Sequence, residues 1–231
     1  MFSLRSITFL AYVVVAFAVY YVPIFNWPFS WWMGFFHEIS KALGILATGG
    51  SVSSLELSLR GMGTSFAQGG NIWFIATCSY CGAVLWGMLI YILADKLHKK
   101  YAIFEAIVLS LFILFISILW VRDILTILIL IIMVGLLLSI IKLHNYSLMK
   151  ITLKFIGIYI VLDGIRTPLN LLDGRIPLDL IPLIQQSTVF TYLSVFLWFC
   201  FALLGIYALW IWHKPTYTKK QVTQDILKYI E

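Results

Sequence analysis

Charged residues are scarce in this chain. Only 11% of the 231 residues are Asp, Glu, Lys or Arg, whereas 62% are hydrophobic. A soluble domain averages about 25% charged and about 45–50% apolar residues, so this chain has more apolar surface than it can enclose itself. The surrounding solvent must therefore be lipid. The same arithmetic excludes an intrinsically disordered chain and a nucleic-acid-binding domain.

Cysteine is also scarce, because the chain has three, too few for a disulfide framework. The sequence contains no glycine-rich phosphate loop, no nucleotide fingerprint and no Ser-His-Asp constellation. We also find no internal repeat and no low-complexity tract.

Long stretches without any charged residue predict membrane-spanning helices. About 20 helical residues are needed to cross about 30 Å of hydrocarbon. Residues 71–94, 124–141 and 188–212 meet this length with no Asp, Glu, Lys or Arg, and residues 102–121 contain only Glu105. We expect each of these stretches to form one span.

The N-terminal uncharged stretch, residues 6–37, is too long for one crossing. Pro23 and Pro28 interrupt it, and we expect two helices near residues 6–23 and 30–47. No small-residue cleavage site follows the first apolar run, so we expect that run to be retained.

A shorter apolar segment, residues 151–162, contains Lys154 and ends at Asp163-Gly164, and it counts as a further full or partial span. The expected fold is an all-α polytopic membrane protein with six or seven transmembrane helices. We expect one integral membrane domain over residues 1–213, followed by a short basic tail, residues 214–231.

Residues 51–67 break the helical pattern. They alternate polar and apolar side chains around Gly61 and Gly63, which is typical of a short β-hairpin. Residues 163–187 hold three aspartates and three prolines within an apolar region. Non-helical backbone at membrane depth is tolerated where it lines a wet cavity or is buried in protein, so this segment suggests a cavity if it dips into the membrane.

Basic residues in short loops predict the orientation, since Lys and Arg stay on the cytoplasmic side. Loops 95–101 and 142–150 and the C-terminal tail are lysine-rich, and we expect all three to be cytoplasmic. A count of seven spans then places the N-terminus outside, whereas Arg5 favours the inside. The sidedness of the N-terminus stays undecided at this point.

The segment His37-Glu38-Ile39-Ser40-Lys41 lies within the second apolar helix. A charge at the centre of a membrane helix costs about 2.5–3.5 kcal/mol on insertion scales, so these neighbours need a physical reason. In the H-E-x-x-H motif two imidazoles bind zinc and the Glu takes a proton from the bound water. Here the last position is Lys41, whose ammonium has no lone pair for a metal. The alternative reading is a neutralised Glu38–Lys41 ion pair with His37 as its neighbour.

Four neighbouring segments resemble the site-2 protease family of intramembrane zinc metallopeptidases, and specifically its B-like branch. The segments are FHEISKALG at 36–44, ATGG at 47–50, the expected hairpin at 52–67 and SYCGAVLWG at 79–87. The resemblance covers residues 35–90 most specifically. It implies a helical bundle in which two His and a distant Asp hold zinc and a Glu acts as general base.

Under this resemblance His37 matches the first metal ligand and Glu38 matches the general base. Asp173, in Asn-Leu-Leu-Asp-Gly, is the first candidate for the third ligand, with Asp179 and Asp163 as alternatives. Each of these aspartates can also be a plain turn residue.

Lys41 departs from the family pattern at the second histidine position. Catalytic zinc sites normally use three protein ligands and a water, so zinc affinity is expected to fall. Cys78 and Cys81, three residues apart, are candidates for replacing the missing ligand. Cofactor expectations are therefore zinc if the protein is active and none if it is not.

We expect a protease-like membrane protein with impaired zinc binding that binds or regulates a membrane partner. The first alternative is an active intramembrane zinc protease with altered ligands. The second is a small transporter or channel, because buried charges commonly mark a polar path. The expected partners are membrane lipid and a transmembrane substrate or partner helix, with no nucleic acid.

Overall fold

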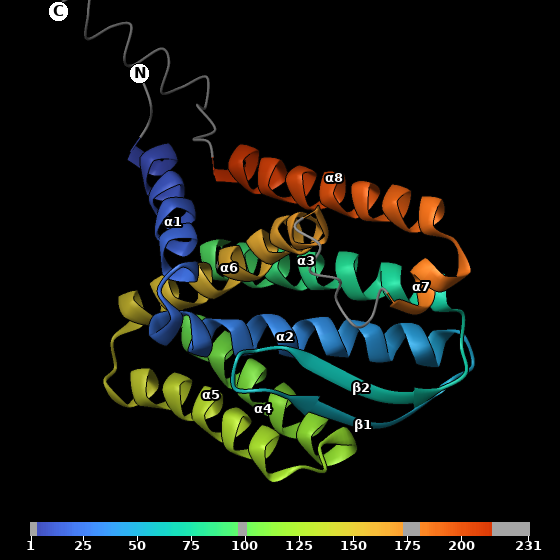
Figure 1. The fold of residues 1–231 in the computed structure, drawn as a ribbon. Coiled ribbons are helices and arrows are strands. Elements are labelled where there is room, and N and C mark those ends of the chain that lie inside the picture. Colours follow the sequence, from blue (N-terminus) through green and yellow to red (C-terminus); the bar gives the residue numbers. More distant parts are fainter. Residues whose placement is uncertain (1–3, 97–100, 173–180, 214–231) are drawn as a thin grey trace, which may run out of the picture.

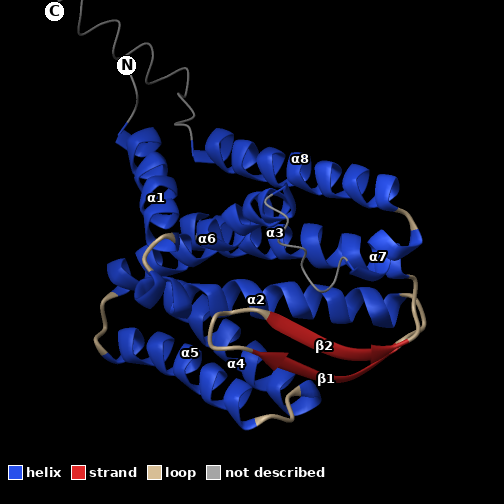
Figure 2. Cartoon of the chain, viewed as in Figure 1, coloured by secondary structure: helices blue, strands red, loops and turns tan. Residues whose placement is uncertain are grey.

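The computed structural model describes residues 4–96, 101–172 and 181–213 (Figure 1). Helices and one hairpin follow one another in the order α1 (Leu4–Tyr20), α2 (Pro23–Ala47), β1 (Ser51–Leu57), β2 (Gly63–Gln68), α3 (Ile72–Lys96), α4 (Tyr101–Trp120), α5 (Ile124–Lys142), α6 (Tyr146–Leu172), α7 (Ile181–Gln186) and α8 (Thr188–His213). Within these described residues, the predominance of helix and the single β-hairpin confirm the predicted all-α class with one short hairpin (Figure 2).

Four of the described helices are long and apolar enough to cross a membrane by themselves: α3, α4, α5 and α8. The α1–α2 pair adds a fifth crossing if it is counted as one bent span. The predicted number of six or seven spans is therefore not confirmed by length and composition. The long helix α6 is the main difference, because it carries Lys150, Lys154, Asp163 and Arg166.

The first predicted helix break was misplaced. We expected the second helix to begin near residue 30, but α2 begins at Pro23 and contains Pro28. Proline is favoured in the first turn of a helix, where its missing N–H would have no intrahelical acceptor. The break therefore lies at Tyr21 and Val22, immediately before Pro23.

The predicted loop that begins at residue 163 was also misplaced, because α6 continues through Asp163-Gly164 to Leu172. A Cβ atom on Gly164 would lie 2.6 Å from Val84 Cγ2 and 3.0 Å from Ala202 Cβ. Gly164 therefore serves close packing among α6, α3 and α8, and does not form a turn.

The helices pack closely where their residues are small. Glycines face each other between α3 and α6, where a Cβ on Gly87 would lie 2.7 Å from the carbonyl oxygen of Gly157. Between α2 and α3, a Cβ on Gly82 would lie 2.7 Å from Ser40, and one on Gly44 would lie 2.8 Å from Cys78. Small residues let membrane helices approach closely enough for van der Waals packing. These contacts hold α2, α3 and α6 together around the middle of the bundle.

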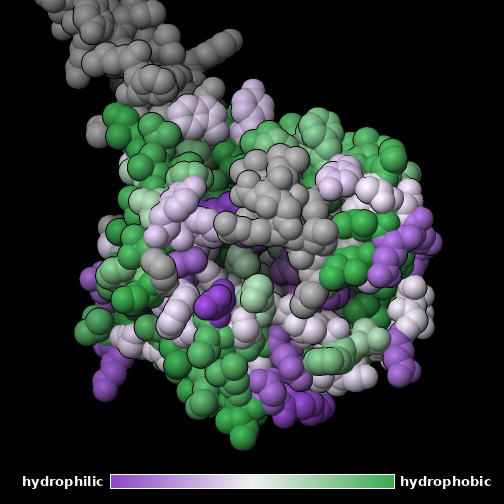
Figure 3. Space-filling model, viewed as in Figure 1, coloured by the Kyte–Doolittle hydropathy of each residue, from purple (hydrophilic) through white to green (hydrophobic). Residues whose placement is uncertain are grey.

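The outer surface is apolar over much of the bundle. Figure 3 shows hydrophobic side chains over α1, along α8 and over α4 and α5, and large hydrophobic residues of these helices are exposed. An apolar surface of this extent is stable only in lipid. The protein is therefore an integral membrane protein.

Candidate functional site

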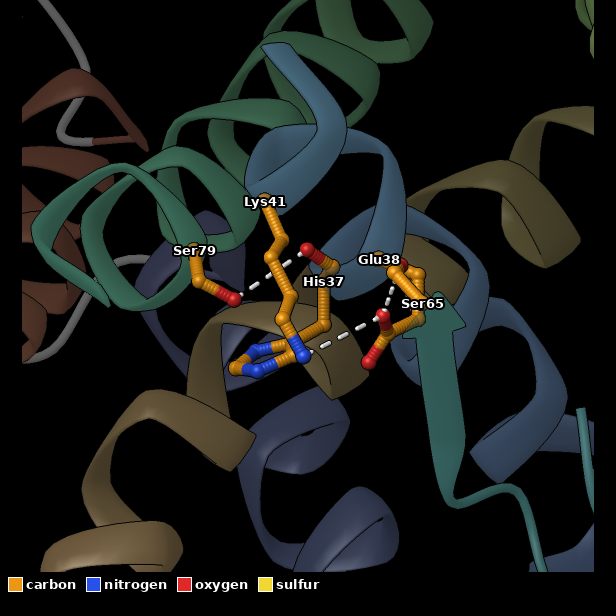
Figure 4. Close-up of polar contacts among 5 residues, drawn as sticks. All are labelled: His37, Glu38, Lys41, Ser65 and Ser79. Carbon is orange, nitrogen blue, oxygen red and sulfur yellow. Dashed lines mark hydrogen bonds and ion pairs between the residues drawn. The ribbon is translucent and has the colours of Figure 1, made fainter. Parts of the chain in front are cut away.

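The polar site is built on the middle of α2, where His37, Glu38 and Lys41 lie on one side of the helix (Figure 4). Residues three and four apart on a helix share a face. The Lys41 Nζ lies 3.8 Å from Glu38 Oε2, and the two side chains are 15% and 1% exposed. The ion pair between positions i and i+3 is thus present, and it neutralises a fully buried carboxylate.

The β-hairpin supplies a second partner for Glu38. The Ser65 hydroxyl of β2 donates a hydrogen bond to Glu38 Oε2. A Cβ atom on Gly63, two residues earlier on the same strand face, would overlap the Glu38 side chain. Strand β2 therefore packs directly against the carboxylate, and a residue without a side chain is required at position 63.

The hairpin is anchored to α2 and α5 at its turn, next to Gly63. The Trp31 indole donates to the Leu59 carbonyl oxygen at 2.9 Å, and the Leu57 N–H donates to the Thr126 hydroxyl of α5 at 2.7 Å. Gly61, at φ +84°, turns the chain where a Cβ would overlap Ser30. These contacts fix the position of Ser65 relative to Glu38.

Helix α3 closes the other side of the site. The Ser79 hydroxyl donates to the His37 carbonyl oxygen at 3.3 Å. The Tyr80 ring meets the His37 imidazole edge to face, with centroids 4.9 Å apart, and stacks on Trp198 of α8 at 4.6 Å. An aromatic wall from α3 and α8 therefore orients the imidazole and shields it from lipid.

The sequence named His37, Glu38 and Lys41 as candidate site residues, and the roles expected for them stay predictions. It missed Ser65, Ser79 and Tyr80 as their neighbours. Ser79 and Tyr80 stand at the start of the SYCGAVLWG segment that carries the family resemblance. Ser65 could have been found from the hairpin alternation, because Gly63 and Ser65 share one face of β2.

The structure places Cys78 and Cys81 against different elements. Cys78 faces Gly44 of α2. Cys81 packs at the edge of an apolar cluster that includes Leu183 of α7 and Trp198 of α8. The two thiols therefore contact different neighbours.

Of the three candidate aspartates, Asp163 lies in α6, while Asp173 and Asp179 lie outside the described residues. Asp163 stands one turn before the buried Arg166 in α6. The prediction that one of these aspartates completes the site stays a prediction.

The described residues do not fit a zinc ion at this site. Zinc needs lone pairs from imidazole, thiolate or carboxylate groups, and Lys41 offers an ammonium that is directed to Glu38. Among residues 4–96, 101–172 and 181–213 no cluster of three His, Cys, Asp or Glu side chains could hold a metal. The arrangement that is observed is a charge-neutral polar site inside an apolar bundle.

Comparison with known proteins covers nearly the whole bundle. The chain matches the family described as Peptidase M50B-like over residues 9–213. The comparison with curated proteins and the comparison with solved structures each give no match. Taken together with the apolar helical bundle, the hairpin and the His37-Glu38 pair, this match shows that the chain belongs to the Peptidase M50B-like family and is an integral membrane homologue of intramembrane metallopeptidases.

Proposed function

We propose that this chain is a protease-like membrane protein with impaired zinc binding, which binds or regulates a membrane partner. The observation that carries the proposal is the Lys41 ammonium, 3.8 Å from the carboxylate at the general-base position. In an active relative, by family resemblance, the second zinc ligand stands there.

The ion pair affects both parts of a zinc hydrolase site. A protonated lysine supplies no lone pair, so the second ligand is lost. The Glu38 carboxylate, which would accept a proton from the metal-bound water, instead accepts a hydrogen bond from Ser65 and lies beside the ammonium. The site therefore lacks one zinc ligand, and Glu38 is less able to act as a general base.

The same ion pair explains how the fold survives without a metal charge. A carboxylate that is 1% exposed in an apolar bundle is costly unless a cation compensates it. Lys41 provides that cation from the same helix. Strand β2 and helices α3 and α8 can then keep their positions around the site, and the site serves to bind a partner and not to catalyse.

The partner class follows from the bundle and the family. Large apolar side chains of α8 and of the hairpin are exposed, including Phe66 next to Ser65. A membrane-embedded surface of this kind fits a transmembrane helix of another protein. If the protein is instead an active protease, the helix bound there is a substrate that is cleaved.

The test replaces Lys41 by His. Purified Lys41→His protein is expected to bind about one zinc per chain, as catalytic sites with three protein ligands do, whereas the wild type is expected to bind little. The matched control is the double variant Lys41→His with His37→Ala, which should lose the gained zinc. Inductively coupled plasma mass spectrometry measures the metal.

Two results would count against this proposal. Wild-type protein that retains about one zinc per chain, and that cleaves a membrane substrate in a chelator-sensitive way, would identify an active protease with altered ligands. A Lys41→His variant that folds normally but gains no zinc would show that more than one ligand is missing and that the charge substitution is not the main difference.

A further inference from the structure

Helix α1 does not continue the direction of the bundle. Helices α1 and α2 meet at a bend of 108°. Figure 1 shows α1 lying across the end of the bundle, whereas α2, α3, α6 and α8 run side by side along it. An apolar helix in that position can lie within one leaflet and need not cross the membrane.

The start of α1 lies where α3 and α8 end. The Phe9 ring is buried, with its centroid 5.9 Å from Tyr91 and 5.8 Å from Trp210. Helix α3 ends at Lys96 and α8 ends at His213, so both partners stand within the last two turns of their helices. The start of α1 and the end of α8 therefore lie at the same end of the bundle.

The end of α1 and the start of α2 lie near that end as well. The Phe29 ring of α2 lies 4.7 Å from Phe155, and the neighbouring Lys154 forms an ion pair with Asp95 beside the end of α3. Asn26 accepts a hydrogen bond from the Tyr159 hydroxyl. Since α2 begins at the same end as α3 finishes, the chain enters and leaves α1 on one side.

A buried arginine holds the corner between α1 and α2. The Arg166 Nη2 donates to the Ala16 carbonyl oxygen at 3.1 Å, and its Cζ lies 4.1 Å from the Tyr20 ring centroid. A cation near the C-terminal carbonyls of a helix is electrostatically favourable. The corner is therefore a fixed structural feature of the bundle.

We propose that α1 is an interfacial helix that binds the lipid surface at the basic end of the bundle and does not span the membrane. In this proposal α2 and α6 cross the membrane together with the four helices that are long and apolar enough by themselves, α3, α4, α5 and α8. An even number of crossings places the start of α1 and the end of α8 on the same face. This inference is independent of the proposed function.

The outward face of α1 fits the hydrocarbon side of that interface. Leu10, Val14 and Phe17 are 54%, 58% and 49% exposed, and they recur at helical spacing along one side. Exposed side chains of this size are stable against acyl chains and unstable in water. The inner face of α1 carries Phe9 and Ala16, which are buried against the bundle.

The charges at this end fit an anionic headgroup layer. Lys96 ends α3, Lys142 ends α5 and Lys150 lies in the first turns of α6. The Lys96 ammonium lies 4.2 Å from the centroid of Trp212, a pairing typical of the interfacial layer. The conflict between Arg5 and the lysine-rich segments disappears if α1 does not span.

Two measurements test this arrangement in phosphatidylcholine and phosphatidylglycerol vesicles. The first attaches a fluorophore to single cysteines at Ile7, Leu10, Val14 or Phe17, in a chain whose native cysteines are replaced by serine, and measures depth with lipid-bound quenchers. An in-plane helix gives one shallow depth at all four positions. A spanning helix places Leu10 near the bilayer centre and Phe17 about 10 Å closer to a surface, at 1.5 Å per residue.

Labels at Ile124 and Ile131 of α5 calibrate the method, because a spanning helix separates them by about 10 Å in depth. The second measurement uses the chain with its native cysteines and carries a protease-cleavable tag at each end. Cleavage of both tags from one side of sealed vesicles supports the proposal. Cleavage from opposite sides, or a centrally placed Leu10, overturns it.

Discussion

At the scale of single residues, one buried carboxylate organises the site. Glu38 takes part in contacts from its own helix through Lys41 and from the hairpin through Ser65. Leaving a buried charge without its partner typically costs about 3–5 kcal/mol. Lys41 is therefore expected to be needed for folding as well as to exclude zinc.

Replacing Lys41 by Met tests that role. We expect the free energy of unfolding to fall by about 3–5 kcal/mol, because the buried Glu38 carboxyl group loses its cation. The double variant Lys41→Met with Glu38→Gln should recover much of the loss. Thermal unfolding in detergent measures both, with Lys142→Met, at an exposed position, as the control. Equal melting temperatures for Lys41→Met and wild type would refute a structural role for the ion pair.

Gly63 gives a second prediction. The Gly63→Ala variant should lower the free energy of unfolding by about 1–3 kcal/mol, because the added methyl group meets the Glu38 side chain. Gly135→Ala is the matched control, because nothing lies within 4 Å of a Cβ at that position. This control is expected to be neutral or to stabilise α5 by up to about 1 kcal/mol. Thermal unfolding in detergent compares the two, and equal effects would contradict the predicted contact.

The residues of the site were predictable to the extent that they share one helix. His37, Glu38 and Lys41 form a local pattern with a known chemical meaning, so the sequence alone made them candidates. Ser65 and Ser79 reach the site from β2 and α3, and no local pattern shows which hydroxyl will face a carboxylate on another element. Tertiary contacts of this kind require the structure.

At the scale of elements, α6 shows why local signals can mislead. Asp163-Gly164 is a typical turn pair, yet it lies inside a helix because Gly164 packs against Val84 and Ala202. The charged residues of α6 also made the sequence predict a shorter apolar segment than the helix that forms. Lys154 pairs with Asp95, and Arg166 contacts Ala16 and Tyr20. These partners lie on other helices and compensate charges that look unfavourable in the sequence.

The α3–α6 contact gives the third prediction. In Gly157→Val the new side chain would meet the Gly87 carbonyl oxygen and Tyr91. The two helices must then separate, and we expect a loss of about 1–3 kcal/mol of stability. The comparison is with Gly135→Val, whose side chain projects into open space. Similar melting temperatures for the two variants in detergent would show that α3 and α6 do not approach closely here.

At the scale of the whole molecule, composition alone identified a helical membrane protein. The number of crossings was harder to predict, because it depends on how each helix is placed relative to the others. The α1–α2 bend of 108° is set by Pro23 at the start of α2 and by contacts with α6 and α8. A hydropathy profile shows how long an apolar stretch is, but it does not show how the axis of that helix is oriented relative to the other helices.

The bundle also explains why a changed ligand position leaves the family fold intact. The packing of α2 against α3, the hairpin and α8 depends on small residues and aromatic contacts, and none of these contacts needs a metal. The stability of wild-type protein is therefore expected to be unchanged by chelators. A zinc-binding Lys41→His variant should instead lose its added stability when zinc is removed.

The zinc content of the purified wild-type protein tests the central claim most directly. Protein prepared with zinc in excess and then freed of loosely bound metal is measured beside the His37→Ala variant. The ion pair of Lys41 with Glu38 predicts a zinc content near background in both proteins. About one zinc per wild-type chain, lost in His37→Ala, would contradict the account and establish a working metal site.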